Sequence, residues 1–209
     1  MGRMDEALEV RRFWFGKLPL TPEGVQGRLA LWFGTDTAEQ QRQADELVRS
    51  RFGALIERAA AGNLAAWGDS PRRRLSLILL LDQFPRQAYR GTGRAFATDR
   101  QALALTLSGM QSAADAALTP VERIFFYMPL QHAELREAQD ESVAAYRRLL
   151  NEAPGELEEL FASSLRYAEV HRSIVARFGR FPHRNRALGR ASTAEEETYL
   201  RAGDRSFGQ

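Results

Sequence analysis

The stretch SPRRRLSLILLLDQF, residues 70–84, decides the fold that we expect for this chain. Ser70 is a typical N-cap residue, and Pro71 suits the first helical turn, where its missing N–H leaves no hydrogen bond unmade. Over residues 75–81 almost every side chain is apolar, so the helix has no polar face. A helix of this kind is stable only when other elements cover it on all sides. We therefore predict that residues 71–81 form the central helix of the protein.

Helical signals recur on both sides of this stretch, whereas the alternating pattern of a half-buried strand does not occur. A Thr followed three positions later by Glu or Gln, the pattern of a capping box, stands at Thr37, Thr98, Thr119 and Thr193. Apolar residues at helical spacing indicate helices over residues 4–15, 37–61, 98–109, 119–128, 135–151 and 154–178, and a short last helix after Thr193. We expect Pro129 to kink or break the helix that begins at Thr119.

Helices joined by short turns favour antiparallel neighbours, so we predict an all-α protein built of stacked antiparallel helical hairpins. The chain has 209 residues, of which 44% are hydrophobic, enough for one domain with a sizeable core but short for two. Residues 1–209 are thus expected to form a single domain, with 203–209 as a loose tail. Residues 86–97 should be a turn-rich connection. The aromatic clusters at 13–16 and 31–34 should pack the N-terminal segment onto the rest.

Charge and composition limit the classes of partner. The formal net charge is only +2, and Lys17 is the single lysine among 29 basic residues. Arginines are planar, bidentate anion binders, but here acidic residues are interspersed among them almost everywhere. A dedicated nucleic-acid binder shows a one-sided basic stripe or a recognition module, so we expect no specific nucleic-acid binding.

Cysteine and hydropathy point to a cellular compartment. The chain has no cysteine, which excludes disulfides, thiolate metal sites and a cysteine nucleophile and favours a reducing cytoplasm. The N-terminal residues lack the apolar region of a secretory signal, and the apolar stretch 75–81 is too short to span a bilayer. We predict a cytoplasmic protein without membrane association.

The three histidines are the candidate catalytic residues. His132 and His171 fall on apolar helix faces, and His183 lies in a loop after residue 178. For each one alone, a buried histidine satisfied by one hydrogen bond is the simpler interpretation. Together they are candidate general acids or bases of one site.

Asp82 continues the apolar stripe of the central helix, so its carboxylate should point inward and needs a cation nearby. One interpretation is a buried ion pair that pins a loop to this helix. The other is a pocket where the end of the central helix, Pro129 and the loop 178–185 meet. The residues that would bind a ligand there are Asp82, Gln83, Arg86, Arg90, Glu134, Arg177, Arg180, Arg184 and Asn185.

Several segments resemble those of a known family. LDQFPR (81–86), YMPL (127–130), FGRFPHRN (178–185) and LGR (188–190) are similar to characteristic segments of the bacterial domain of unknown function 924 family. The resemblance covers most of the chain and implies a TPR-like α/α superhelix, although the sequence shows no 34-residue repeat. No biochemistry is established for that family.

The chain departs from the family pattern at one point. After Pro129 the pattern reads Leu-Glu-His-Ser-Glu, whereas residues 130–134 here read Leu-Gln-His-Ala-Glu. His132 and Glu134 are kept, but one acid and one hydroxyl are missing. If that acid is a metal ligand or general base in the relatives, this chain lacks the group.

Three functional hypotheses remain. The first is a protein that binds an anionic small molecule or an acidic peptide through arginine and histidine side chains. The second is an enzyme acting on a small anionic substrate with a histidine as general acid or base. The third is a structural role for all these residues. The sequence does not fix the oligomeric state.

Cofactor chemistry is not expected. No predicted helix carries the paired metal-ligand spacings His-x-x-x-His or Glu-x-x-His, and the many arginines would repel a cation, so we predict no metal site. The glycine-rich phosphate loop, the nucleophile elbow and the dinucleotide fingerprint are also missing from the sequence.

Overall fold

A computed structural model describes residues 5–17, 20–35, 37–153 and 155–202, and these residues form helices and turns with no strand among them. The all-α prediction is therefore confirmed. The α-helices are α1 (Glu6–Phe15), α2 (Pro22–Gln26), α3 (Leu29–Phe33), α4 (Ala38–Ala60), α5 (Pro71–Leu81), α6 (Gln83–Ala88), α7 (Asp99–Gln111), α8 (Pro120–His132), α9 (Arg136–Asn151), α10 (Glu158–Phe178) and α11 (Ala194–Arg201). Short 3-10 turns are η1 (Ala65–Asp69), η2 (Gly93–Phe96), η3 (Ala114–Ala117), η4 (Gly155–Leu157) and η5 (Pro182–Arg184).

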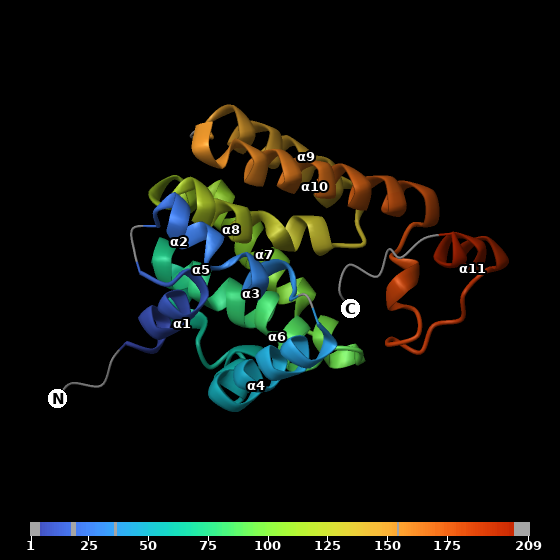
Figure 1. Cartoon of the computed structure of the whole chain (residues 1–209), viewed down its shortest axis with the longest axis horizontal. Helices are drawn as coiled ribbons and strands as arrows, with labels where there is room; N and C mark the ends of the chain where they lie inside the picture. Colours follow the sequence, from blue (N-terminus) through green and yellow to red (C-terminus); the bar gives the residue numbers. More distant parts are fainter. Residues whose placement is uncertain (1–4, 18–19, 36, 154, 203–209) are drawn as a thin grey trace.

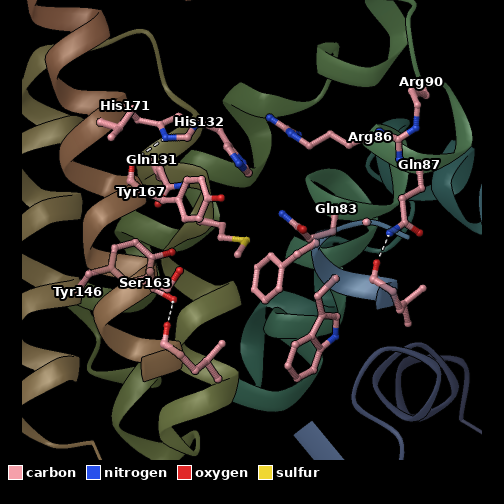
Figure 2. A pocket seen from close by; sticks show the side chains of 18 of the residues that line it. Gln83, Arg86, Gln87, Arg90, Gln131, His132, Tyr146, Ser163, Tyr167 and His171 are labelled. Atoms are coloured by element: carbon pink, nitrogen blue, oxygen red, sulfur yellow. Dashed lines mark hydrogen bonds between the residues drawn. The ribbon is translucent and has the colours of Figure 1, made fainter. Parts of the chain in front are cut away.

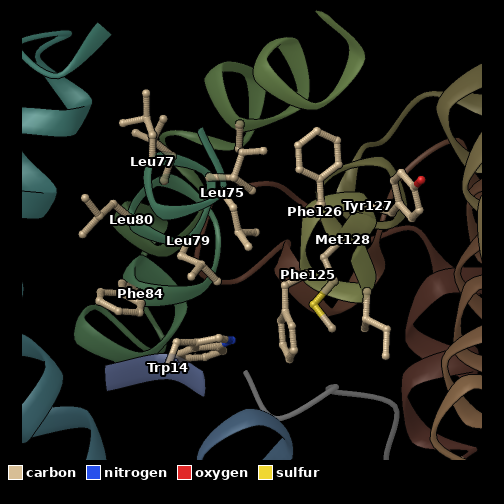
Figure 3. Close-up of a cluster of buried hydrophobic side chains, with 14 of the residues drawn as sticks. Trp14, Leu75, Leu77, Leu79, Leu80, Phe84, Phe125, Phe126, Tyr127 and Met128 are labelled. Carbon is tan, nitrogen blue, oxygen red and sulfur yellow. The ribbon is translucent and has the colours of Figure 1, made fainter. Parts of the chain in front are cut away.

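Helix α5 is the centre of the molecule, as predicted. All residues from Leu75 to Leu81 are buried, and α1, α4, α6, α7 and α8 pack around them. Figure 3 shows the leucines of α5 and the aromatic side chains of α8 within one cluster. Ser70 makes no capping hydrogen bond, so Pro71 and the burial that follows it are sufficient to begin the helix.

The aromatic residues of the N-terminal segment pack onto α8. The ring centroids of Trp14 and Phe15 each lie 5.5 Å from that of Phe125, and Trp32 lies 4.8 Å from the same ring. Edge-to-face and tilted pairs at these separations add to the free energy gained by burial. The predicted docking of the two aromatic clusters is confirmed, except that Phe33 is 52% exposed.

Of the four capping boxes predicted at threonines, two form completely, one forms only the hydrogen bond to the threonine hydroxyl, and one does not form. Thr119 and Thr193 form complete capping boxes, and Thr37 accepts a hydrogen bond from the backbone N–H of Gln40. The prediction for Thr98 was wrong, because its hydroxyl donates instead to the carbonyl of Leu81, at 2.6 Å. This hydrogen bond ties the start of α7 to the end of α5.

Two prolines lie within helices. Helix α8 continues through Pro129 to His132, so it does not break there. Pro85 lies in the first turn of α6, where the missing N–H is tolerated, so the connection expected at 86–97 instead contains helical turns. Pro154, which we expected to start the long helix, lies outside the described residues, and α10 begins at Glu158. The predicted tail 203–209 also lies outside them.

The helices form layers around α5. Helices α9 and α10 lie side by side and antiparallel along one edge, with α8 beside them, while α4 covers the opposite side (Figure 1). Helix α11 and the loop before it lie beyond the end of α10 (Figure 1). A regular TPR-like superhelix stays a prediction. Within the part of the chain that the structure describes, no helix is long and apolar enough to cross a membrane.

Candidate functional site

A cavity of about 690 Å³ opens between α3 and α6 on one side and α8 and α10 on the other (Figure 2). This size is typical of small-molecule sites. Its polar lining comprises two arginines, two histidines, four glutamines and several hydroxyl groups: Arg86, Arg90, His132, His171, Gln41, Gln83, Gln87, Gln131, Tyr146, Ser163, Ser164 and Tyr167. An apolar wall completes it with Leu31, Trp32, Phe33, Met128, Leu160 and Val170.

An aspartate–histidine pair lies at the cavity. Asp82 is fully buried, and its Oδ1 lies 2.7 Å from Nδ1 of His132. Because a carboxylate can only accept, Nδ1 carries the hydrogen and Nε2 holds a lone pair. His132 is the last residue of α8, and its ring points into the cavity towards the side chain of Arg86 (Figure 2).

The cation expected beside the buried carboxylate of Asp82 is Arg86. Its Nη1 lies 3.1 Å from Asp82 Oδ1 and donates to the Asp82 backbone carbonyl at 2.6 Å. Burial alone would raise the pKa of Asp82, but the charge of Arg86 and the hydrogen bonds from His132 and Gln83 hold that pKa below its usual range. Asp82 is therefore ionised at neutral pH.

Both histidines of the cavity are neutral. Burial, followed by the charge of Arg86, lowers the pKa of His132, and Asp82 only partly offsets this. The ring of His171 lies 6.3 Å from that of His132 and donates from Nδ1 to the carbonyl of Tyr167 at 2.8 Å. Burial and the neighbouring His132 lower the pKa of His171 to about 3. Neutral imidazoles can accept protons but cannot serve as fixed positive charges.

His183 does not line the cavity. Its ring lies 5.5 Å from that of Phe181, which in turn lies 5.3 Å from His171, so Phe181 connects the two histidines. Burial and the charge of Arg184 lower the pKa of His183 to about 3. The structure thus brings two of the three candidate histidines together at the cavity.

Asp99 is shared by two arginines behind the cavity. Its Oδ2 accepts from Arg86 Nη2 at 2.9 Å and from Arg184 Nη1 at 3.0 Å. The guanidinium of Arg184 also lies 4.7 Å from the ring of Phe96 and 4.5 Å from that of Phe181. Burial lowers the pKa of Arg184 to about 10, so it stays charged. Arg184 is a buried link between α7 and the loop.

The remaining predicted ligand-binding residues hold the C-terminal segment together. Arg180 donates to both oxygens of Glu196 at 2.7 and 2.8 Å, and Asn185 donates to the same carboxylate at 3.2 Å. Arg177 pairs with Glu195, and Glu134 pairs with Arg190. None of these residues lines the cavity. Of the predicted arginines, only Arg86 and Arg90 do, and Arg90 pairs with Asp45 at 2.6 Å.

Much of the lining was not identified from the sequence. Trp32, Gln87, Gln131 and Tyr167 reach the cavity from four different helices, and nothing local in the sequence distinguishes these positions. Asp99 was missed for the same reason, since Arg184 is 85 residues away from it along the chain. Among the described residues, no group of three or more histidine and acidic side chains is placed to hold a metal ion.

The fold and the cavity define an all-helical protein with a buried Asp–His–Arg cluster beside a small-molecule-sized cavity. The family described as "Bacterial protein of unknown function (DUF924)" matches residues 10–204, and the chain belongs to this family. The predicted resemblance is thereby confirmed. A solved structure of a protein of unknown function from Agrobacterium tumefaciens is similar, with 34% sequence identity, a TM-score of 0.77, and coverage of 95% of this chain and 98% of that one. The search among curated proteins gave no match.

Proposed function

We propose that the protein is an enzyme that performs acid–base chemistry on a small anionic molecule bound in the cavity, with His132 as the general base. The supporting observation is the 2.7 Å contact between Asp82 Oδ1 and His132 Nδ1, with the ring at the cavity. A buried carboxylate on Nδ1 selects one tautomer, orients the ring and stabilises the imidazolium that forms when Nε2 takes a proton.

The lining supports the class of substrate. The cavity has two arginines and no carboxylate among its described lining residues, and several glutamine side chains offer further N–H donors. These groups suit a substrate with one acidic group. Trp32, Phe33 and Met128 would contact an apolar or aromatic part of the same molecule.

The proposed step uses only residues of this chain. His132 Nε2 accepts a proton from a hydroxyl group of the substrate or from a bound water, and Asp82 balances the charge of the resulting imidazolium. Arg86, which is already fixed by Asp82 and Asp99, would face negative charge that develops on the substrate. The deprotonated oxygen forms a bond to the acyl or phosphoryl centre of the substrate, the bond from that centre to the leaving group breaks, and the imidazolium returns its proton to the leaving group.

The test compares two histidines. Activated esters, amides and phosphate monoesters would be screened for turnover with the wild-type protein, and hits repeated with His132→Asn and, as the matched control, His183→Asn. We expect His132→Asn to lower kcat about 100-fold or more, as is typical for loss of a general base, and His183→Asn to leave it nearly unchanged. Equal activity in His132→Asn and the wild type would contradict the proposal.

A binding protein without turnover is the second candidate. It is favoured by the ion pairs of the two cavity arginines. Arg86 pairs with Asp82 and Asp99, and Arg90 pairs with Asp45, so neither guanidinium is reserved for stabilising charge on a reacting substrate. Under this alternative, small carboxylates raise the thermal midpoint, His132→Asn weakens that effect, and none of the screened compounds is turned over.

A further inference from the structure

We propose that a second concave site, at the opposite end of α8 from the cavity, binds a polyvalent phosphate-type anion such as pyrophosphate. Thr119 and Glu122, at the start of α8, form one wall, whereas His132 ends the same helix at the cavity. The site is independent of the proposed enzymatic function. Its remaining lining comes from α1, the segments that follow it and the first turn of α5: Leu8, Arg11, Arg12, Gly16, Lys17, Arg28 and Arg72.

Positive charge is concentrated at this second concave site. Five of its lining side chains are cationic, and Glu122 is the one carboxylate among them. The whole chain has a formal net charge of only +2, so these lining residues carry a larger net positive charge than the entire protein. An excess of cations lining one concave surface raises the local concentration of anions.

Three of the five cationic side chains at this site have no carboxylate partner among the described residues. Glu122 pairs with Arg11, but in the described part of the chain Lys17, Arg28 and Arg72 form no ion pair with a carboxylate. The Nε–H of Arg11 is also buried without a hydrogen-bond partner among the described atoms. By contrast, the arginines 177, 180, 184 and 190 of the C-terminal segment all contact carboxylates. Donor groups are therefore left over at this site.

One of the arginines is held in position. Arg28 Nη1 donates to the carbonyl of Phe13 at 3.2 Å, which fixes the guanidinium against the end of α1. Gly16 has a φ of 79°, and a Cβ at this residue would lie 2.5 Å from Arg28 Nη2. The absence of a side chain at Gly16 thus permits both the positive φ and the close approach of Arg28. A site with a fixed guanidinium loses less conformational entropy when an anion binds.

The lining selects the chemical class of ligand. Leu8 is the only large apolar side chain among the described lining residues, and no aromatic ring is present there for a nucleobase to stack on. Guanidinium groups bind phosphate oxygens through paired N–H donors, and the excess of positive charge favours an anion of more than one negative charge. A compact phosphate group therefore fits better than a monocarboxylate or a nucleoside.

Binding would be measured by isothermal titration calorimetry with inorganic pyrophosphate, and with acetate as the monovalent comparison. We expect pyrophosphate to bind the wild-type protein, and Arg72→Gln and Lys17→Gln each to weaken binding at least several-fold. The matched control is Arg100→Gln, which removes the same charge from an exposed position on α7. It should bind pyrophosphate like the wild type.

Three results would overturn the proposal: no binding of pyrophosphate by the wild type, unchanged affinity in Arg72→Gln and Lys17→Gln, or an equal loss in Arg100→Gln. The last would mean that pyrophosphate responds to overall charge alone. Neither Lys17 nor Arg72 forms an ion pair with a described residue, so both variants should keep the wild-type thermal midpoint without ligand. His132→Asn should retain pyrophosphate binding, which separates this site from the proposed catalytic cavity.

Discussion

At the scale of single residues, Asp82 connects three parts of the molecule. It ends α5, accepts from His132 at the end of α8, and contacts Arg86 of α6. A carboxylate with no exposure is tolerated only because these partners replace its water shell. The same contacts orient the His132 ring, so stability and the proposed chemistry depend on one side chain.

Replacement of Asp82 should therefore be costly. Asp82→Ala leaves Arg86 without one of its counter-charges inside the protein, and we expect the free energy of unfolding to fall by about 3 kcal/mol. The matched control is Asp140→Ala, whose ion pair with Arg172 is half exposed and should contribute less than about 1 kcal/mol. Urea denaturation of both variants measures the difference, and similar losses in the two would refute the special role of Asp82.

His171 should make the protein sensitive to mild acid. Its pKa is lowered to about 3 in the folded state by burial, while an unfolded histidine titrates near about 6.5. Between these values the unfolded chain binds the additional proton, so the free energy of unfolding falls as the pH falls through this window. Urea denaturation at about pH 7 and pH 5 should show a smaller loss for His171→Gln than for the wild type. An equally steep loss in the variant would show that other groups cause the effect.

At the scale of helices, close packing rather than propensity decides where glycine is required. Gly109 in α7 faces α8, and a Cβ there would lie 2.6 Å from Phe126 Cζ and 2.9 Å from Arg74 Cδ. Gly53 in α4 has nothing within 4 Å of the same position. Both lie inside helices, where alanine is intrinsically the better residue.

Substitution by alanine should change the free energy of unfolding in opposite directions at the two glycines. Gly109→Ala is expected to lower the free energy of unfolding by about 1–3 kcal/mol, because the buried ring of Phe126 must move. Gly53→Ala should raise it by up to about 1 kcal/mol through helix propensity alone. Thermal and urea denaturation of the two variants provide the measurement, and stabilisation in both would mean that α7 and α8 are less tightly packed than described.

At the scale of the whole molecule, one hydrophobic cluster runs from α1 to α10. It includes Trp14, Trp32 and Trp67, whereas Ile174, Val175 and Phe181 form a smaller cluster near the C-terminal segment. No boundary divides the larger cluster into two cores, which is the arrangement of a protein that unfolds cooperatively.

Unfolding should therefore occur in one main transition. Circular dichroism at 222 nm reports the helices, and tryptophan fluorescence reports the three buried indoles of the main cluster. We expect urea curves from the two probes to coincide. Midpoints that differ between the probes would indicate separately unfolding units and contradict the single domain predicted for residues 1–209.

The sequence by itself determined the longer helices, because their signals are local: apolar side chains every three or four residues, Thr119 and Thr193 followed by Glu, and Pro71 at a first turn. The short helices α2, α3 and α6 were not predicted. It also predicted that Asp82 is buried and needs a cation nearby, because the residue continues the apolar stripe of the central helix; the structure shows that this cation is Arg86.

Only the tertiary structure decided which polar groups meet across the chain. Asp99 and Arg184 are 85 residues apart, and Glu134 and Arg190 are 56 apart, so no local pattern predicts these pairs. These long-range contacts bind the loop arginines to carboxylates and leave His132 and His171 at the cavity. They also leave Lys17, Arg28 and Arg72 together at the other end of α8. An arginine binds whichever carboxylate the packed helices bring within reach, and that distance is set by the fold as a whole.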